Sequence, residues 1–216
     1  MNLLFFGDSI VQGLWDESGG WPDRIKQDIY REHLENSAPF LDYNMVYLRG
    51  VPGDTSEDLK QRIGSELEDA TDHSGSEVNV VFSVGINDCG KTSGESEVYI
   101  ENYRENLEEI IDRVSKRADT VIAVGLTPVD EERLNSEETA DHYTNSEVRK
   151  YNEVLREVCE EKDVKFVPVF EELVQDEEWT KNLFDGLHPD SEGHKKIYEL
   201  VRDDIVDSLG PQLSKK

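Results

Sequence analysis

The feature that most constrains this chain is the alternation of short apolar runs with longer amphipathic stretches. The apolar runs predict strands over residues 3–6, 43–48, 78–84, 120–126 and 165–170. Between them, apolar residues recur every three or four positions, which predicts helices over residues 22–34, 56–67, 97–117, 148–158 and 191–207. Strands that alternate with helices are typical of a parallel sheet covered on both faces. The sequence therefore predicts an α/β fold, a three-layer α/β/α sandwich around a mostly parallel sheet of five strands.

The length and the even pattern predict a single domain over residues 1–216. A chain of 216 residues is long enough to bury one core, and it contains no internal repeat and no linker-like composition shift. No stretch approaches the ~18 consecutive apolar residues of a membrane span. Residues 128–145 contain few apolar positions and many acids, so we expect a long loop there.

The N-terminus and the cysteines bear on the cellular compartment. Only Met1 and Asn2 precede the first predicted strand, which leaves no room for the basic and apolar segments of a secretory signal, so we expect a cytoplasmic protein. Cys89 and Cys159 have no metal-ligand spacing, and two buried thiols are the preferred interpretation over a disulfide.

Charge is the second strong signal. The chain has 49 Asp and Glu against 23 Lys and Arg, a formal net charge of −26. On an expected surface of roughly 10,000 Å² the acids would lie on the order of 14 Å apart, comparable with the ~10 Å Debye length at 0.1 M salt. Nucleic acid and anionic membranes are poor partners for such a surface. We expect adaptation to a salt-rich cytoplasm, with an ordinary acidic protein as the alternative.

Four polar segments, residues 7–9, 50–55, 84–88 and 185–189, follow strand-like runs. They place Ser9, Gly53, Asn87, Asp185 and His188 where the carboxyl ends of parallel strands gather functional groups. Serine, histidine and a carboxylate together make an alcohol nucleophilic at neutral pH. A backbone N–H and an amide side chain are suitable donors to a developing oxyanion. Each segment alone is also compatible with a plain turn or a helix cap, so the joint presence of all four is the signal.

In this order, the four segments closely resemble the SGNH/GDSL hydrolase family from end to end of the chain. The resemblance implies a flavodoxin-like hydrolase fold in which Ser9 is the nucleophile, with Asp185 and His188 completing the triad. It also implies an oxyanion hole formed by the N–H groups of Ser9 and Gly53 and the amide of Asn87. The implied activity is hydrolysis of a small-molecule acyl ester or thioester through an acyl-enzyme, with no cofactor and no metal. Leu48 departs from the pattern, because many members have asparagine there.

Two other classes of function remain open from the sequence. A metal-dependent phosphoesterase would use Asp8, Asp185 and His188 as ligands, and sensitivity to a chelator would identify it. A catalytically silent binding scaffold would have lost part of the triad, and none is lost here. An ester hydrolase explains more of the four segments than either alternative.

Several other residues have simpler interpretations. We expect Asp8 to stabilise its turn through a backbone hydrogen bond, and His194 to be a packing or surface residue. We expect Trp15, Trp21 and Trp179 to be core or loop anchors, although Trp15 follows Ser9 closely enough to border a pocket.

Overall fold

A five-stranded sheet forms the centre of the molecule, with strand order β2-β1-β3-β6-β8. The computed structural model describes residues 1–35, 44–71, 77–92, 94–135 and 141–209. All neighbouring strands of this sheet pair in parallel, so the predicted α/β fold is confirmed and the sheet is wholly parallel. The order is that of flavodoxin-like doubly wound sheets. The strands are β1 (Asn2–Gly7), β2 (Met45–Gly50), β3 (Val78–Ser83), β6 (Thr120–Val124) and β8 (Lys165–Val167).

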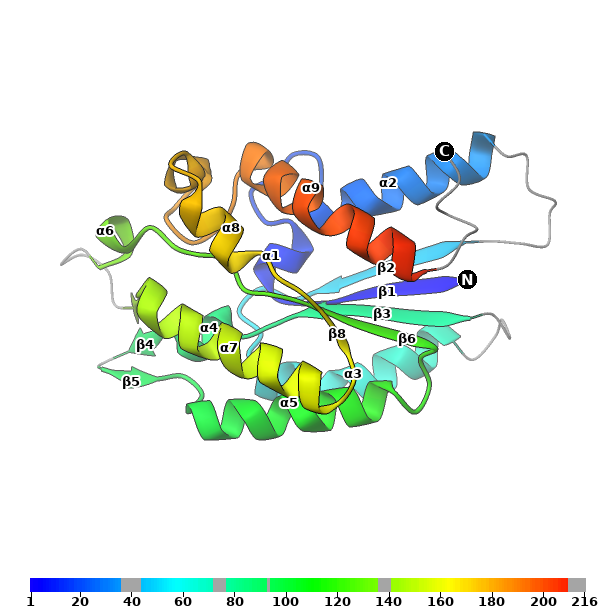
Figure 1. The fold of residues 1–216 in the computed structure, drawn as a ribbon, viewed down its shortest axis with the longest axis horizontal. Coiled ribbons are helices and arrows are strands. Elements are labelled where there is room, and N and C mark those ends of the chain that lie inside the picture. The colour runs from blue at the N-terminus through cyan, green and yellow to red at the C-terminus, as the bar shows by residue number, and fades with distance from the viewer. Residues whose placement is uncertain (36–43, 72–76, 93, 136–140, 210–216) are drawn as a thin grey trace.

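Five long helices cover the two faces of the sheet. Helices α2 and α9 lie side by side over one face, and α3, α5 and α7 cover the other (Figure 1). Each helix buries one apolar stripe, for example Leu59, Ile63 and Leu67 on α3. The helices are α2 (Gly20–Glu35), α3 (Ser56–Thr71), α5 (Ile100–Val114), α7 (Asn145–Glu161) and α9 (Ser191–Ser208).

Strand β1 shows why its sequence is continuously apolar rather than alternating. Residues 3–6 are all fully buried, because helices pack on both faces of this central strand. Phe5, for example, meets Trp21 of α2 edge to face at 5.5 Å. The buried apolar residues of the described chain form one continuous cluster around this strand and β3.

The carboxyl end of the sheet contains short elements that the sequence pattern does not predict. The segment 128–145 is not a plain loop: it contains α6 and β7, and β7 pairs with β4 in a small antiparallel sheet, while residues 136–140 lie outside the described part. The last strand ends at Val167, before Pro168, and not at residue 170 as expected. The short elements are α1 (Ser9–Gln12), α4 (Ile86–Cys89), β4 (Lys91–Thr92), β5 (Glu95–Ser96), α6 (Glu131–Leu134), β7 (Asp141–His142), α8 (Phe170–Gln175) and η1 (Trp179–Asn182).

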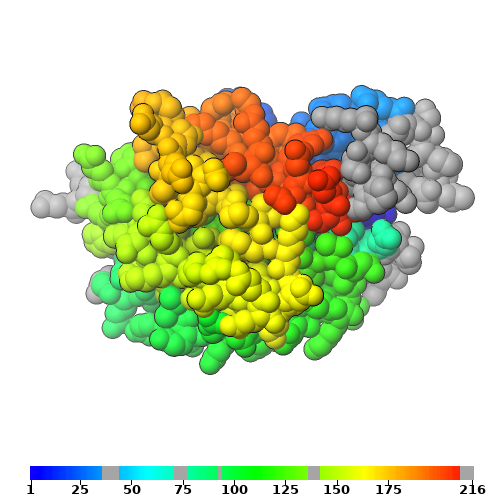
Figure 2. Space-filling model, in the orientation of Figure 1, coloured from blue at the N-terminus to red at the C-terminus, as the bar shows by residue number. Residues whose placement is uncertain are grey.

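The surfaces of helices α7, α8 and α9 form a large part of the face seen in Figure 2. Among the described residues, no helix is long and apolar enough to cross a membrane.

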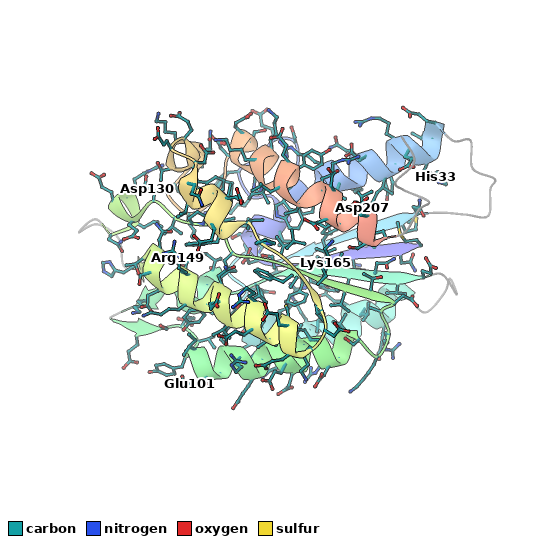
Figure 3. All side chains as sticks on the ribbon, in the orientation of Figure 1. His33, Glu101, Asp130, Arg149, Lys165 and Asp207 are labelled. Atoms are coloured by element: carbon teal, nitrogen blue, oxygen red, sulfur yellow. The ribbon has the colours of Figure 1, made fainter. Side chains whose placement is uncertain are left out.

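Most described lysines and arginines lie in ion pairs with Asp or Glu, and most of these pairs are partly or largely exposed. Arg149 on α7 and Lys165 on β8 are labelled in Figure 3. Arg149 pairs with Glu171 at 2.9 Å, and Lys165 pairs with Asp204 at 2.7 Å. Because the sequence has 49 acids and only 23 Lys and Arg, this pairing cannot neutralise the surface.

Candidate active site

Three neighbouring strands end together at the edge where the site lies. Gly7 of β1 is in register with Gly50 of β2 and Ser83 of β3. A Cβ atom on Gly7 would lie 2.2 Å from the Ser83 carbonyl oxygen, so only glycine allows the strands to approach this closely. Ser9, Gly53 and Asn87 follow these strand ends by two, three and four residues, so the topology brings them to one edge of the sheet.

Ser9 is the first residue of α1, and the turn before it is held by Asp8. The Asp8 Oδ1 atom accepts a hydrogen bond from the Ile10 backbone N–H at 2.9 Å, which confirms the expected role of this side chain. Both Asp8 and Ser9 are only 3% exposed. Burial raises the pKa of Asp8 to about 7, although backbone hydrogen bonds act in the opposite direction. Ser9 therefore has a fixed backbone position at the mouth of the sheet.

Ser9, His188 and Asp185 form a continuous hydrogen-bonded chain. The Ser9 Oγ atom lies 2.9 Å from His188 Nε2, and His188 Nδ1 lies 2.7 Å from Asp185 Oδ2. The other Asp185 oxygen, Oδ1, accepts the backbone N–H groups of Leu187 and His188 at 3.0 and 2.8 Å. Partial burial favours a raised pKa for Asp185, but these hydrogen bonds outweigh it and lower the pKa. An ionised Asp185 in this position orients the imidazole ring toward Ser9.

Gly53 and Asn87 line one shared cavity of about 220 Å³. Gly53 has a left-handed backbone with φ of +83°, and no atom lies within 4 Å of the position a Cβ would take. The Asn87 side-chain amide donates one hydrogen bond to the Asp54 carbonyl oxygen at 2.8 Å. Because an amide carries two N–H groups, Asn87 can still donate a second hydrogen bond to a substrate. The structure thus brings both expected oxyanion donors to one cavity.

A buried polar cluster behind Asn87 is absent from the sequence-based prediction. Both carboxylate oxygens of Asp88 accept the Ser56 backbone N–H at 3.0 Å, and the Ser56 hydroxyl also bonds to Asp88. Asn106 of α5 donates to the Ser56 Oγ atom at 2.9 Å. Burial raises the pKa of Asp88 to about 6. This cluster ties α4, which contains Asn87, to α3 and α5.

Arg62 of α3 binds the backbone at the ends of strands β1 and β2. Its Nη2 atom donates to the carbonyl oxygens of Gly7 and Arg49, both at 3.0 Å, and its Nε atom contacts Asp54 Oδ2 at 2.6 Å. Asp54 in turn provides the carbonyl that binds Asn87. No sequence pattern identifies this contact, because Arg62 lies on an otherwise ordinary amphipathic helix.

Arg133 of α6 performs a similar task for the loop that contains Asp185 and His188. Its guanidinium donates to the carbonyl oxygens of Leu183 and Phe184, each at 2.7 Å. Nearby, the Asp130 N–H donates to the Gly186 carbonyl at 2.8 Å, and Figure 3 shows Asp130 beside α6 at the end of the molecule. The segment 128–145, which we expected to be a long loop, therefore holds the loop of Asp185 and His188 in place through hydrogen bonds.

The three tryptophans do not behave alike. Trp21 and Trp179 are each 2% exposed, which agrees with their expected role as anchors. Trp15 is 53% exposed and stacks on Phe184 with ring centroids 4.9 Å apart, so it is not a core residue.

His194 and the cysteines are core residues, as the sequence suggested. His194 is fully buried on α9, and burial lowers its pKa to about 4, so it is a packing residue and not a surface one. Cys89 and Cys159 are free and buried, and burial raises the pKa of both thiols. Neither thiol is suited to be a nucleophile.

The described residues contain no group of three His, Cys, Asp or Glu side chains arranged to hold a metal ion. Asp8, Asp185 and His188, the ligand set considered from the sequence, are therefore not such a group.

Comparison with known proteins identifies the family. A model of the GDSL-like lipase/acylhydrolase family matches residues 5–196. The chain belongs to this family. A GDSL esterase/lipase from Oryza sativa subsp. japonica is 28% identical to it over 207 residues, covering 92% of this chain and 75% of the relative.

Solved structures share the fold of this GDSL family member. A lipase/acylhydrolase from Enterococcus faecalis superposes with a TM-score of 0.68 at 23% identity, covering 94% of each chain. An acetylxylan esterase from Geobacillus stearothermophilus gives a TM-score of 0.71 at 18% identity and covers 100% of this chain and 96% of its own. These two structures show the fold, whereas the family match, together with the esterase/lipase from Oryza sativa, shows that the protein is a carboxylic ester hydrolase.

Proposed function

We propose that this protein is a serine esterase that cleaves short-chain acyl esters through an acyl-enzyme formed on Ser9. The observation that supports the proposal most directly is the hydrogen-bonded chain from Ser9 Oγ through His188 to Asp185, with distances of 2.9 and 2.7 Å. This is the arrangement in which a serine hydroxyl transfers its proton as it attacks.

In the proposed mechanism, each of these groups has one role. Ser9 Oγ attacks the ester carbonyl while His188 Nε2 takes its proton, and Asp185 stabilises the resulting imidazolium. The oxyanion receives hydrogen bonds from the N–H groups of Ser9 and Gly53 and from the amide of Asn87. Collapse of the tetrahedral intermediate expels the alcohol, which takes its proton from His188. Water then attacks the acyl carbonyl while His188 takes its proton. Collapse of this second intermediate releases the carboxylic acid, and His188 returns the proton to Ser9 Oγ.

The cavity beside the oxyanion donors favours a short acyl group. Its volume of about 220 Å³ lies below the ~300–1,000 Å³ of typical ligand pockets. Thr55, Asp58 and Glu97 contribute polar or acidic lining, which suits an acetyl group better than a long alkyl chain. The net charge of −26 also disfavours the anionic acyl-CoA thioesters, so we propose an oxygen ester as the substrate.

Two measurements test this proposal. A fluorophosphonate probe should label Ser9, and Ser9→Ala should abolish the labelling; labelling that survives the substitution would remove the assignment. A series of p-nitrophenyl esters from acetate to palmitate should show kcat/KM falling as the chain lengthens. An optimum at long chains would contradict the short-acyl proposal while leaving the triad intact.

The cytoplasmic location and the salt-rich environment stay predictions from the sequence.

A further inference from the structure

Trp15 and Phe184 form an exposed aromatic pair that the catalytic steps do not use. Their side chains are 53% and 57% exposed, and the rings stack with an interplanar angle of 30°. An exposed pair of stacked aromatic rings is suited to contact a ligand, because it offers a large rigid apolar surface.

Trp15 lies in the turn after α1, the helix that begins at Ser9, and Phe184 lies in the loop that contains His188. Trp15 follows Leu14, whose N–H donates to the Ser9 carbonyl at 3.0 Å. On the other loop, the Phe184 N–H donates to the His188 carbonyl at 2.8 Å. The stacked rings therefore join the turn after α1 to the loop of His188, close in sequence to the two side chains of the Ser9–His188 hydrogen bond.

The backbone at Trp15 indicates that the turn itself does not need this ring. Trp15 has φ of +67°, a left-handed conformation that is uncommon for bulky residues and easier for asparagine or glycine. A tryptophan therefore stays at this position at some conformational cost, with half of its surface in solvent.

The catalytic geometry indicates which part of a substrate these rings face. His188 must return its proton to the leaving oxygen, so the alcohol part of the ester lies on the His188 side, whereas the cavity lined by Gly53 and Asn87 lies on the oxyanion side. An alcohol that contacts exposed aromatic rings should present a flat apolar surface. The net charge of −26 repels an anionic alcohol.

Building on the proposed esterase function, we propose that Trp15 and Phe184 form a platform for the alcohol part of the ester. The alcohol that fits is an uncharged ring, such as the pyranose of an acylated sugar, whose C–H face stacks on the aromatic pair. Arg133 supports this platform by binding the Phe184 carbonyl at 2.7 Å.

Kinetics on two esters test the platform. We compare an acetylated methyl xylopyranoside with ethyl acetate, using Trp15→Asn and Phe184→Ala. Each substitution should lower kcat/KM for the sugar ester about 5- to 10-fold, mainly through KM, and lower it much less for ethyl acetate. Because asparagine accepts the left-handed backbone, Trp15→Asn should keep its melting temperature, which separates lost binding from lost folding.

Control variants complete the experiment. Tyr99 is an aromatic residue of similar exposure, 56%, at the start of α5 and outside both loops, so Tyr99→Ala should change neither ester. Phe184→Tyr keeps the ring and should restore the preference for the sugar ester. Equal losses of kcat/KM on both esters would show that the pair only stabilises the two segments, and would refute the platform. A higher kcat/KM for acetylcholine than for the sugar ester would also overturn the proposal.

A binding measurement separates this proposal from the esterase function. In Ser9→Ala, methyl xylopyranoside should protect tryptophan fluorescence from quenching by acrylamide, because Trp15 is exposed while Trp21 and Trp179 are buried. The protection should vanish in Ser9→Ala with Trp15→Asn. No protection in Ser9→Ala would refute the platform, whereas full esterase activity in Ser9→Ala would refute the nucleophile and leave the platform standing.

Discussion

The two halves of the candidate site are held in place by different means. Ser9, Gly53 and Asn87 follow adjacent strands of the buried sheet, so strand register and close glycine packing fix them. The loop that contains Asp185 and His188 lies between η1 and α9, and the Asp185 side chain is 39% exposed. Contacts from α6 hold that loop. The nucleophile half therefore depends on the fold, whereas the acid–base half depends on a few individual hydrogen bonds.

The largest expected effect tests the nucleophile half. Ser9→Ala should lower kcat on a short ester by up to about 10⁶, the scale seen when a serine nucleophile is lost. The melting temperature should hardly change, because the turn is held by Asp8 and not by the hydroxyl. Steady-state kinetics and thermal melts check both statements, and substantial remaining activity would place the nucleophile elsewhere.

The next largest loss of kcat is expected from a substitution in the acid–base half. Asp185→Asn should lower kcat by about 10⁴, since the amide no longer fixes the imidazole tautomer. Its hydrogen bonds from the Leu187 and His188 N–H groups can survive in the variant, so the loop should keep its shape. A loss smaller than tenfold would show that another group orients His188.

A smaller loss of kcat is expected from a substitution at the sheet edge. Asn87→Ala should reduce kcat by roughly 10²–10³ with little change in KM, because an oxyanion donor acts mainly in the transition state. The variant also removes the bond to the Asp54 carbonyl, so thermal melts are needed as a control. A rise in KM at constant kcat would assign Asn87 to substrate binding instead.

Arg133→Ala tests directly whether the contacts from α6 position the loop of His188. It removes the two hydrogen bonds to the Leu183 and Phe184 carbonyls, and a displaced His188 should lower kcat about 10-fold. Lys181→Ala, which removes a 67% exposed cation of η1, provides the matched control. If both variants behave like the wild type, the α6 contacts do not position the loop.

Salt should change the stability of the whole molecule, and it should have the smallest effect on the two halves of the site. Between 0.1 and about 1 M salt the Debye length falls from ~10 to ~3 Å, which screens repulsion among the excess acids. Individual surface ion pairs contribute only ~0–1 kcal/mol, so their loss should not cancel this gain. Thermal melts at increasing KCl concentration should show a rising melting temperature; a flat or falling series would refute the halophile prediction.

The parts of the structure that follow from the sequence are those with continuous or periodic patterns. The apolar run of β1 and the stripe of α3 specify the sheet and its helices, and the polar residues after each strand identify Ser9 and Asn87. Elements of two to four residues, such as α6 and β7, are too short to show any periodicity. Arg133 and the Trp15–Phe184 pair depend on contacts between distant segments, which no local pattern records. The early end of β8 could have been inferred, because Pro168 cannot donate a ladder hydrogen bond.

The two buried thiols can report separately on the opening of the oxyanion edge and of helix α7. Cys89 lies in α4 beside Asn87, and Cys159 lies in α7, away from the strand ends. Since both are free and buried, a thiol reagent can reach each sulfur only while its surroundings are transiently open. The ratio of the two modification rates therefore reports how often the oxyanion edge opens by itself, without unfolding of the remaining molecule.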